Sequence, residues 1–394
     1  MENLVFYGHS PNLGGAEKSL FELVKSVKIN SEFNPIVILP SDEGLIVEWY
    51  KSVKIDVSIL HFPWMISSEV NKNLEEFMID VSSSYYKHLD LLKTFKPAAI
   101  FTQTSVQSMS ALCASTLEVP HFWNIREYGI KDHKLFEVMS NTSSVDQFIS
   151  LSDKIYVSSK SLGDYLFKFK QNVDWKPLYS QPRKSQNSNV PRKTDSSIIK
   201  IIFAGSLSDS KNPVFLVKLA SSLRALGINF QIDLFGIGIL EEKLHNEIVI
   251  NDLKDFVGMK GHRPDMENLY PLYDFVISCA PNEAFGRSLS EGATFGCIPV
   301  FPQIDSWNER FEDGGTGISY PLDDSDLLAR KLNNIFNSSQ LIDLQVKIKN
   351  FADSGFSISD PGEIFINDLK SILGKKYVKK DLNPEIKKVF HVNS

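Results

Sequence analysis

The sequence predicts an α/β protein built from two Rossmann-like halves. Short apolar runs, rich in β-branched and aromatic residues, alternate with stretches of helical periodicity along most of the chain. A polar, proline-broken segment, residues 181–197, interrupts this alternation near the middle. The chain has 394 residues, of which 42% are hydrophobic, and this is enough for two domains with separate cores.

The N-terminal half alternates predicted strands with helices. This order is typical of a parallel sheet that is covered on both faces. A helix is expected to begin at Gly15, because Ala16, Leu20, Leu23 and Val27 recur at helical spacing. The chain start lacks the basic flank of a signal peptide and is interpreted as the first strand. The expected strands are Leu4–His9, Pro35–Leu39, Val57–His61, Ala98–Thr102, His121–Arg126 and Lys154–Ser158.

The C-terminal half repeats the pattern after a linker at residues 181–199. We expect domains at residues 1–180 and 200–356, and a helix within residues 357–394 that crosses back to the first domain. The basic tail, residues 375–380, is interpreted as a solvated terminus or, alternatively, as a weak contact with anionic lipid. The expected strands of this half are Ile198–Ala204, Phe230–Phe235, Phe256–Met259, Phe275–Cys279, Ile298–Phe301 and Gly317–Tyr320.

The composition excludes several classes of protein. A formal net charge of -6 argues against a general nucleic-acid binder. Cys113, Cys279 and Cys297 lie far apart and are expected to be reduced core residues, and the histidines have no metal-ligand spacing. No stretch approaches the roughly 20 apolar residues needed to cross a bilayer. We therefore expect a cytoplasmic protein, or one bound at the inner face of the cell membrane, that holds no metal.

Two strand-to-helix turns contain residues suited to a bound phosphate. Ligands of open parallel sheets lie at the carboxyl ends of strands, where helix N-termini offer free N–H groups. The first turn contains Gly14 and Gly15, which permit close backbone approach. The second follows Gly205 and contains Lys211, which would neutralise a diphosphate or, as for most loop lysines, would simply be solvated.

A third turn, residues 281–292, follows the apolar strand Phe275–Cys279. A helix is expected to start near Gly286, so that the N–H groups there would face a phosphate. Glu291 would lie inside this helix and Glu283 in the loop before it, and carboxylates accept hydrogen bonds from sugar hydroxyls. The spacing alone favours two surface glutamates on a polar face.

Glu283 and Glu291, with Phe285-Gly286 between them, resemble the E-x7-E motif of retaining GT-B glycosyltransferases of family 4, the glycosyl transferases group 1. The resemblance covers nearly the whole chain. The other segments that resemble this family are Gly14–Glu17, Lys154–Ser158, Gly205–Lys211, Leu234–Gly238, Val257–Asp274 and Gly314–Gly317.

The resemblance implies a GT-B fold, in which two Rossmann-like domains face each other across a cleft. It also implies a metal-independent transfer that retains the anomeric configuration, with the acceptor on the first domain and the nucleotide sugar on the second. Lys211 would hold the diphosphate, Glu291 the ribose and Glu283 the donor sugar, and Glu283, Arg126 and Lys211 would be catalytic. The donor-binding candidates are Gly205, Ser206, Lys211, Arg263, Glu283, Phe285, Gly286, Arg287, Ser288 and Glu291.

Two positions depart from the family pattern. Ser206 stands where the family usually has an arginine, and Arg287 or Arg263 would have to supply the missing cation. Arg126-Glu127 stands where many relatives have His-Asp or His-Glu, so Arg126 either binds a phosphate or charged acceptor or pairs with a carboxylate. His121, earlier in this strand, is expected to be structural. The acceptor-side candidates are His9, Gly14, Gly15, Thr102, Arg126 and Glu127, with Gln103 and Thr104 beside them.

The expected function is transfer of a hexose or N-acetylhexosamine from a nucleotide-diphosphate sugar, UDP rather than GDP, to a glycan or lipid-linked glycan. Bacterial surface polysaccharide or lipopolysaccharide synthesis is the expected setting, and no cofactor is expected beyond the nucleotide sugar. Ser206 and Arg126 motivate an alternative, a catalytically silent protein that binds glycan or a sister transferase. A sugar-nucleotide epimerase is disfavoured by the family segments.

Overall fold

The computed structural model describes residues 1–67, 73–133, 136–137, 148–170, 173–182, 197–338, 340–354, 356, 359–375, 377–378 and 380. The chain divides into two compact units. Unit 1 comprises Met1–Gln181 and Ser359–Ser394, and unit 2 comprises Pro182–Ile358. Most of the predicted linker, together with Lys376 and Lys379 of the basic tail, lies outside the described residues.

Unit 1 is built on a seven-stranded sheet with the order β3-β2-β1-β5-β6-β8-β9. Every neighbouring pair in it is parallel. The order of the strands along the chain reverses between β1 and β5, and ligands of such sheets bind beyond the carboxyl ends of strands at that point. The strands are β1 (Asn3–Tyr7), β2 (Asn34–Leu39), β3 (Asp56–Ile59), β5 (Pro97–Gln103), β6 (His121–Ile125), β8 (Lys154–Val157) and β9 (Trp175–Pro177).

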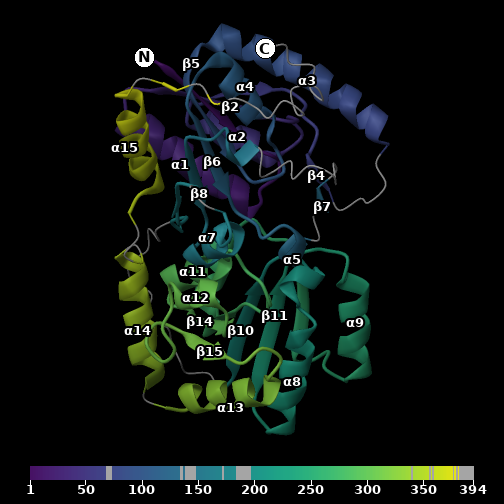
Figure 1. The fold of residues 1–394 in the computed structure, drawn as a ribbon. Coiled ribbons are helices and arrows are strands. Elements are labelled where there is room, and N and C mark those ends of the chain that lie inside the picture. Colours follow the sequence, from purple (N-terminus) through teal and green to yellow (C-terminus); the bar gives the residue numbers. More distant parts are fainter. Residues whose placement is uncertain are drawn as a thin grey trace. The chain divides into compact units, whose positions relative to one another are not determined.

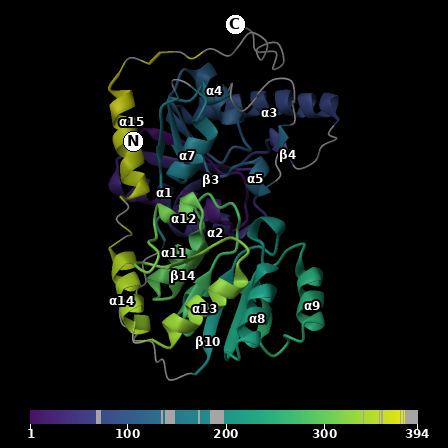
Figure 2. The same cartoon turned by 60° about the horizontal axis from the view of Figure 1, so that its bottom comes forward.

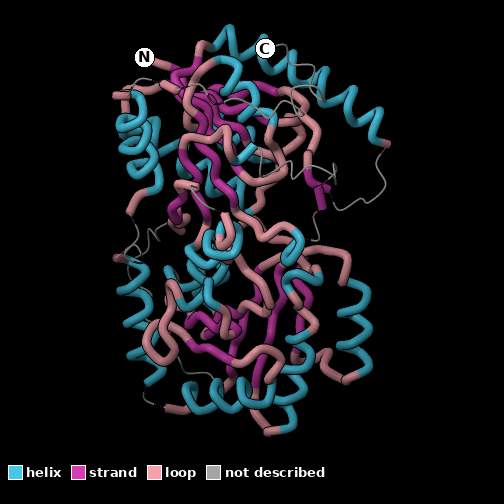
Figure 3. Tube along the Cα trace, in the orientation of Figure 1, coloured by secondary structure: helices cyan, strands magenta, loops and turns pink. Residues whose placement is uncertain are grey.

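Helices lie on both faces of this sheet (Figure 3). They are α1 (Gly15–Asn30), α2 (Leu45–Ser52), α3 (Leu74–Phe95), α4 (Met109–Leu117), α5 (Ile130–His133), α7 (Lys160–Phe167) and α15 (Pro361–Leu373). Helix α1 begins at Gly15 as predicted and buries Leu20, Leu23 and Val27. Two short strands that the sequence did not predict, β4 (Ile66–Ser67) and β7 (Phe136–Glu137), pair antiparallel outside the main sheet.

Helix α15 packs on α1 and completes the aromatic core of unit 1 (Figure 1). Its Phe365 ring is buried, and its centroid lies 5.7 Å from that of Phe6, 5.2 Å from that of Phe101 and 5.0 Å from that of Phe122. These three partners stand on β1, β5 and β6. A residue that follows the whole of unit 2 in the sequence therefore fills the centre of unit 1.

The described end of the chain is also attached to unit 1. The Lys380 ammonium lies 3.1 Å from Asp153 Oδ1, and the Lys380 carbonyl accepts a hydrogen bond from the Ser115 hydroxyl at 2.5 Å. The interpretation of the tail as solvated is therefore wrong for Lys380, whereas Lys375 is exposed. The sequence shows only a basic run at this place, whereas in the structure Lys380 forms an ion pair with a carboxylate of the protein.

Unit 2 contains a six-stranded parallel sheet with the order β12-β11-β10-β13-β14-β15. This is the strand order of a Rossmann fold, with its reversal between β10 and β13. The strands are β10 (Ile199–Ala204), β11 (Phe230–Phe235), β12 (Val257–Gly261), β13 (Phe275–Ile277), β14 (Ile298–Pro302) and β15 (Ile318–Tyr320). All six predicted strands of this half are present, and the bounds of β11 are those predicted.

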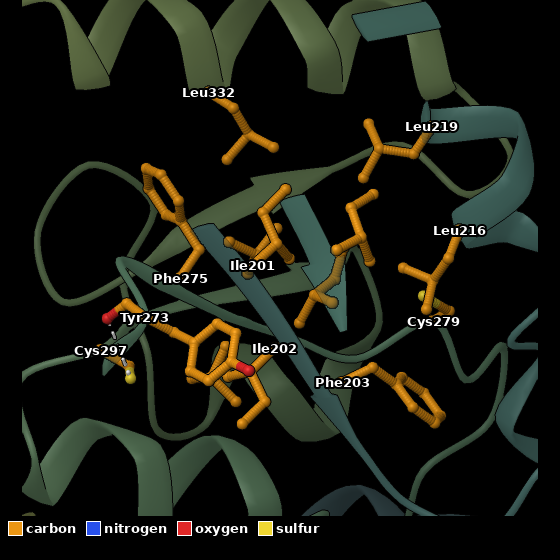
Figure 4. Close-up of a cluster of buried hydrophobic side chains, with 14 of the residues drawn as sticks. Ile201, Ile202, Phe203, Leu216, Leu219, Tyr273, Phe275, Cys279, Cys297 and Leu332 are labelled. Carbon is orange, nitrogen blue, oxygen red and sulfur yellow. Dashed lines mark hydrogen bonds between the residues drawn. The ribbon is translucent and has the colours of Figure 1, made fainter. Parts of the chain in front are cut away.

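Helices cover this second sheet, and α13 lies beside α8 (Figure 2). The core between sheet and helices contains Ile201 and Phe275 from the strands, with Leu216, Leu219 and Leu332 from α8 and α13 (Figure 4). Cys113, Cys279 and Cys297 are free and buried, as expected. The helical elements are η1 (Asp209–Lys211), α8 (Phe215–Ala225), α9 (Glu241–Ile250), α10 (Met266–Leu269), η2 (Tyr270–Leu272), α11 (Arg287–Thr294), α12 (Asp305–Asn308), α13 (Ser325–Phe336) and α14 (Gln340–Asp353).

Candidate functional site

The strongest candidate site lies in unit 2, at the carboxyl ends of β10, β11 and β13. The loops after β10 and β11 touch backbone to backbone: a Cβ on Gly236 would lie 1.8 Å from the carbonyl oxygen of Gly205. The Leu207 N–H donates to the Ile237 carbonyl at 3.0 Å, which fixes the two loops together. The Gly-rich turn after β11 thus shapes the loop that carries Lys211.

Lys211 and Glu283 form an ion pair between the loops after β10 and β13. Lys211 Nζ lies 2.5 Å from Glu283 Oε2, and the two side chains are 30% and 12% exposed. The residues are 72 positions apart in sequence and meet because β10 and β13 are neighbours in the sheet. Two candidates that the sequence selected from separate turns are therefore brought together at the switch point of the sheet.

Helix α11 begins next to this ion pair. Its N-cap, Gly286, has φ +64°, and a Cβ there would lie 2.0 Å from the Trp307 ring, so only glycine fits. The first N–H groups of the helix have no partner inside the helix and can bind an anion. The helix start predicted near Gly286 is confirmed.

Glu291 is held by Arg287, four residues before it on α11. Arg287 Nε donates to Glu291 Oε1 at 3.1 Å, and both side chains are largely buried. Arg287 was predicted to contact the diphosphate and Glu291 the ribose. The structure places the two groups in contact with each other at the start of the helix.

Arg310 is a residue of this site that the sequence did not reveal. It is buried, donates from NH1 to Ser290 Oγ at 2.8 Å and from NH2 to the Phe285 carbonyl, and lies 3.9 Å from the Phe285 ring centroid. Trp307 contacts the same guanidinium at 4.8 Å. Arg310 thereby ties the loop before Gly286 to helix α11. A lone arginine in Asn308–Phe311 carries no motif that would have indicated this.

The remaining donor-side candidates differ in their surroundings. Ser206, beside Gly205, is exposed, and its hydroxyl lies 3.0 Å from that of Ser208. Arg263 forms an exposed fork with Asp265, with contacts of 2.9 and 2.7 Å, and these hydrogen bonds lower the pKa of the Asp265 carboxyl. The Phe285 ring is buried, so its predicted donor contact could be made only by its backbone. Ser288, in the first turn of α11, is partly exposed.

In unit 1, His9 and Glu17 meet at the carboxyl end of β1. His9 Nε2 lies 3.0 Å from Glu17 Oε1, and Glu17 is only 5% exposed. Gly14 is the N-cap of α1, with Gly15 following, and its N–H donates to the Glu17 carboxylate. The residue of the Gly-Gly turn that anchors its surroundings is thus Glu17, which was not among the predicted site residues.

Burial raises the pKa of the Glu17 carboxyl from 4.5 to about 7, although hydrogen bonds from the N–H groups of Glu17 and Gly14 and the charge of Arg126 act in the opposite direction. Between these pH values the folded protein keeps a proton that the unfolded chain has lost. We therefore expect the free energy of unfolding to fall with rising pH in this window, by up to about 3 kcal/mol. Urea denaturation at several pH values measures this fall in the free energy of unfolding. Glu17→Gln should flatten the dependence, and Glu32→Gln, at an exposed position beyond the other end of α1, should not; an unchanged slope in Glu17→Gln would contradict this assignment.

Two of the acceptor-side candidates, Thr102 and Glu127, have buried side chains that bond to other residues of unit 1. Thr102 is fully buried, and its hydroxyl is bonded to Ser110 and, at 2.8 Å, to His121 Nε2. Glu127 is 7% exposed and accepts hydrogen bonds from the N–H and hydroxyl of Ser105, each at 2.5 Å. Gln103 and Thr104 are buried as well. Packing between strands, which the sequence does not display, turned these groups inward.

His121 is a structural residue, as expected. Its Nδ1 lies 2.8 Å from Ser152 Oγ, and burial lowers the pKa of its imidazole to about 3. Arg126, by contrast, lines a small surface hollow together with Glu22, Asn124 and Tyr179. This position is consistent with both roles predicted for Arg126, the binding of a ligand and an ion pair with a carboxylate.

Two further observations concern the described residues only. Within them, no three His, Cys, Asp or Glu side chains gather as metal ligands do. Of the helices in the same part of the chain, none has both the length and the apolar character to cross a bilayer.

Residues 185–354 match the family model described as glycosyl transferases group 1. The chain is also similar to two curated bacterial proteins, each the GtfA subunit of a UDP-N-acetylglucosamine–peptide N-acetylglucosaminyltransferase. The Streptococcus gordonii protein is 28% identical over 133 residues, 34% of this chain and 25% of that protein. The Streptococcus pneumoniae protein is 25% identical over 184 residues, 46% of this chain and 35% of that protein. The similarity thus spans well under half the length of these relatives.

Solved structures resemble nearly the whole chain. HepE of Anabaena, in complex with UDP and glucose, has a TM-score of 0.75 at 16% identity, covering 94% of this chain and 100% of that chain. The pneumococcal O-GlcNAc transferase GtfA, in complex with UDP and GlcNAc, has a TM-score of 0.71 at 12% identity, covering 95% and 99%. At these identities the likeness concerns the fold, and the prediction of two Rossmann-like domains of the GT-B class is confirmed.

Proposed function

We propose that the chain is a glycosyltransferase that takes its sugar from a UDP-sugar, because residues 185–354 match the family model of the glycosyl transferases group 1. The observation that carries this proposal is the contact between Lys211 and Glu283 beside the start of α11. The cation and the helix N-terminus can bind a diphosphate, and the carboxylate can bind the hydroxyls of a sugar. These are the groups that a sugar diphosphate requires. The names of the curated relatives contain UDP-N-acetylglucosamine, and this supports uracil as the base of the donor nucleotide.

In the proposed reaction, the bond between the anomeric carbon and the diphosphate oxygen breaks while the acceptor hydroxyl adds to the same face of that carbon. The proton of the hydroxyl passes to the departing phosphate, and the configuration is retained. Lys211 and the N–H groups at Gly286 and Arg287 stabilise the charge that develops on the diphosphate. In this proposal, groups of the protein itself neutralise the leaving diphosphate, and no metal ion takes part.

Glu283 and Glu291 would bind the two sugars of the donor. The Glu283 carboxylate accepts hydrogen bonds from hydroxyls of the transferred hexose or N-acetylhexosamine, and Glu291 from those of the ribose. Both carboxylates are already oriented, one by Lys211 and the other by Arg287. Donor binding then exchanges part of each ion pair for contacts to the ligand.

The acceptor in this proposal is a glycan or a lipid-linked glycan of a bacterial cell surface, bound by unit 1. We propose a cytoplasmic location with the basic tail near the inner face of the membrane. Deletion of residues 375–394 tests that contact: recovery of the protein with membranes should drop, and unchanged recovery would exclude it.

A panel of nucleotide sugars tests the activity. UDP-glucose, UDP-galactose, UDP-N-acetylglucosamine and GDP-mannose are each added to the protein, followed by thermal unfolding and NMR detection of slow sugar release. At least one UDP-sugar should raise the unfolding temperature and be hydrolysed, because ligands stabilise the state that binds them. Indifference to every donor would overturn the proposal and favour the silent partner that Ser206 and Arg126 suggest.

A further inference from the structure

Helices α5 and α7 of unit 1 expose large apolar side chains. Ile130, the first residue of α5, is 60% exposed, and Tyr165 on α7 is 42% exposed. Phe169, two residues beyond the end of α7, is 90% exposed. Single apolar residues on a surface are ordinary, whereas a contiguous group of them indicates an interaction surface.

Contacts between the two helices make these residues one surface. The Lys131 ammonium, next to Ile130 in sequence, lies 4.0 Å from the centroid of the Tyr165 ring. The C-cap of α7, Lys168, keeps helical backbone angles, with φ −49° and ψ −36°. Phe169 therefore stands one helical turn after Tyr165, on the same side of the helix. The exposed ends of α5 and α7 thus form a contiguous patch.

The charge of this surface is opposite in sign to that of the whole chain, which has a formal net charge of -6. Within the described residues of α5 and α7, Asp164 is an exposed carboxylate, and Asp132 is buried and accepts a hydrogen bond from the Tyr128 N–H at 2.8 Å. The lysines on or directly after these helices are Lys131, Lys160, Lys168 and Lys170. Apolar side chains and an excess of positive charge therefore occur together here.

We propose that the α5–α7 patch, formed by Ile130, Lys131, Tyr165, Lys168 and Phe169, binds an anionic lipid surface. The apolar side chains enter the boundary between headgroups and acyl chains, and the ammonium groups lie near the lipid phosphates. Lysine suits such a place because its methylene stem can lie on apolar surface while its charge stays in water. The patch contains none of the donor-site residues and none of residues 375–394, so its role goes beyond the proposed function.

A lipid surface fits the α5–α7 patch better than a folded protein partner does. The cores of protein interfaces are depleted in lysine. Here Phe169 has a lysine on each side in sequence, the Lys168 ammonium lies 5.4 Å from its ring centroid, and Lys131 lies over the Tyr165 ring. Apolar and aromatic side chains bordered by lysines are typical of surfaces that lie at the level of lipid headgroups.

Flotation of the full chain with lipid vesicles tests the α5–α7 patch in the absence of any nucleotide sugar. Vesicles of phosphatidylcholine with and without phosphatidylglycerol are compared at low salt. The chain should float only with the vesicles that contain phosphatidylglycerol, and added salt should release it. Phe169→Ser should weaken this binding about tenfold, whereas Phe169→Trp should keep it, because an indole lies well at the headgroup level.

The lysines are tested by a double variant, Lys131→Gln/Lys168→Gln. Its binding to anionic vesicles should be about 20-fold weaker, because each lysine near such a surface contributes about fivefold. The matched charge control is Lys218→Gln/Lys243→Gln, at exposed positions on α8 and α9 of unit 2. The matched apolar control is Ile250→Ser, at a position at the end of α9 that is 78% exposed. Both controls should bind vesicles as the wild-type chain does.

Three outcomes would overturn the role of the α5–α7 patch. The first is a wild-type chain that does not float with anionic vesicles, even if it binds a protein or a single-stranded oligonucleotide through Phe169. The second is wild-type binding by both Phe169→Ser and the double lysine variant. The third is binding that deletion of residues 375–394 abolishes and Phe169→Ser leaves intact, since the tail would then make the contact. Vesicle binding needs no donor, so a chain without transferase activity would leave this test unaffected.

Discussion

Replacing Glu283 by glutamine is expected to lower kcat/KM for the cognate UDP-sugar by about 100- to 1000-fold, a loss comparable with removal of one preorganised transition-state contact. Glutamine keeps the size of the side chain but removes the charge that pairs with Lys211 at 2.5 Å. The hydrogen bonds to the donor sugar would be weakened, and Lys211 would no longer be held in its orientation. Initial rates over a range of donor concentrations give the two constants.

The matched control is Glu242→Gln, at an exposed position on α9, which should keep the wild-type rate. Lys211→Met and the double variant Lys211→Met/Glu283→Gln complete a double-mutant cycle. Because the two groups contact each other, the double variant should lose much less than the product of the single effects. A Glu283→Gln enzyme at full rate would show that this carboxylate does not bind the donor sugar.

Replacing Arg310 by methionine is expected to lower the free energy of unfolding of unit 2 by about 4 kcal/mol. The substitution leaves the Phe285 carbonyl and the Ser290 hydroxyl without their buried donor, and each such loss costs about 1–3 kcal/mol. It also removes the contact of the guanidinium with the Phe285 ring at 3.9 Å. Chemical denaturation followed by circular dichroism measures the change.

The same variant should also bind UDP-sugars more weakly under conditions where it remains folded, since Arg310 fixes the loop between Glu283 and α11. Arg330→Met, which changes an exposed arginine on α13, is the control and should alter neither quantity. Wild-type stability in Arg310→Met would show that the guanidinium is not needed to hold this loop.

The strands were predictable because the sheets are parallel and buried. Such strands read as largely apolar runs, as Phe275–Ile277 does, and Phe230–Phe235, which also contains Gln231 and Asp233, was located to the residue. Strands β4, β7 and β9 were missed because two or three residues carry no periodicity. Their existence depends on a neighbouring strand and not on local sequence.

The candidate site could be predicted only in part. Lys211 and Glu283 were selected because turns at the carboxyl ends of strands bind ligands, and the sheet order does bring them together. Thr102 and Glu127 were selected by the same argument, and their side chains are buried against partners from other segments, which the sequence does not display. Arg310 belongs to no motif, and only the fold shows that it is buried against the Phe285 ring.

The position of Phe365 has a consequence for how the chain is made. During synthesis the N-terminal part emerges first, and domains generally fold as they leave the ribosome. Phe6, Phe101 and Phe122 nevertheless cannot gain their partner on α15 until residues 182–358 have been translated. The nascent first unit must therefore wait with an incomplete aromatic core, so that premature termination after unit 2 would leave an apolar, aggregation-prone surface on a chain that already contains both sheets.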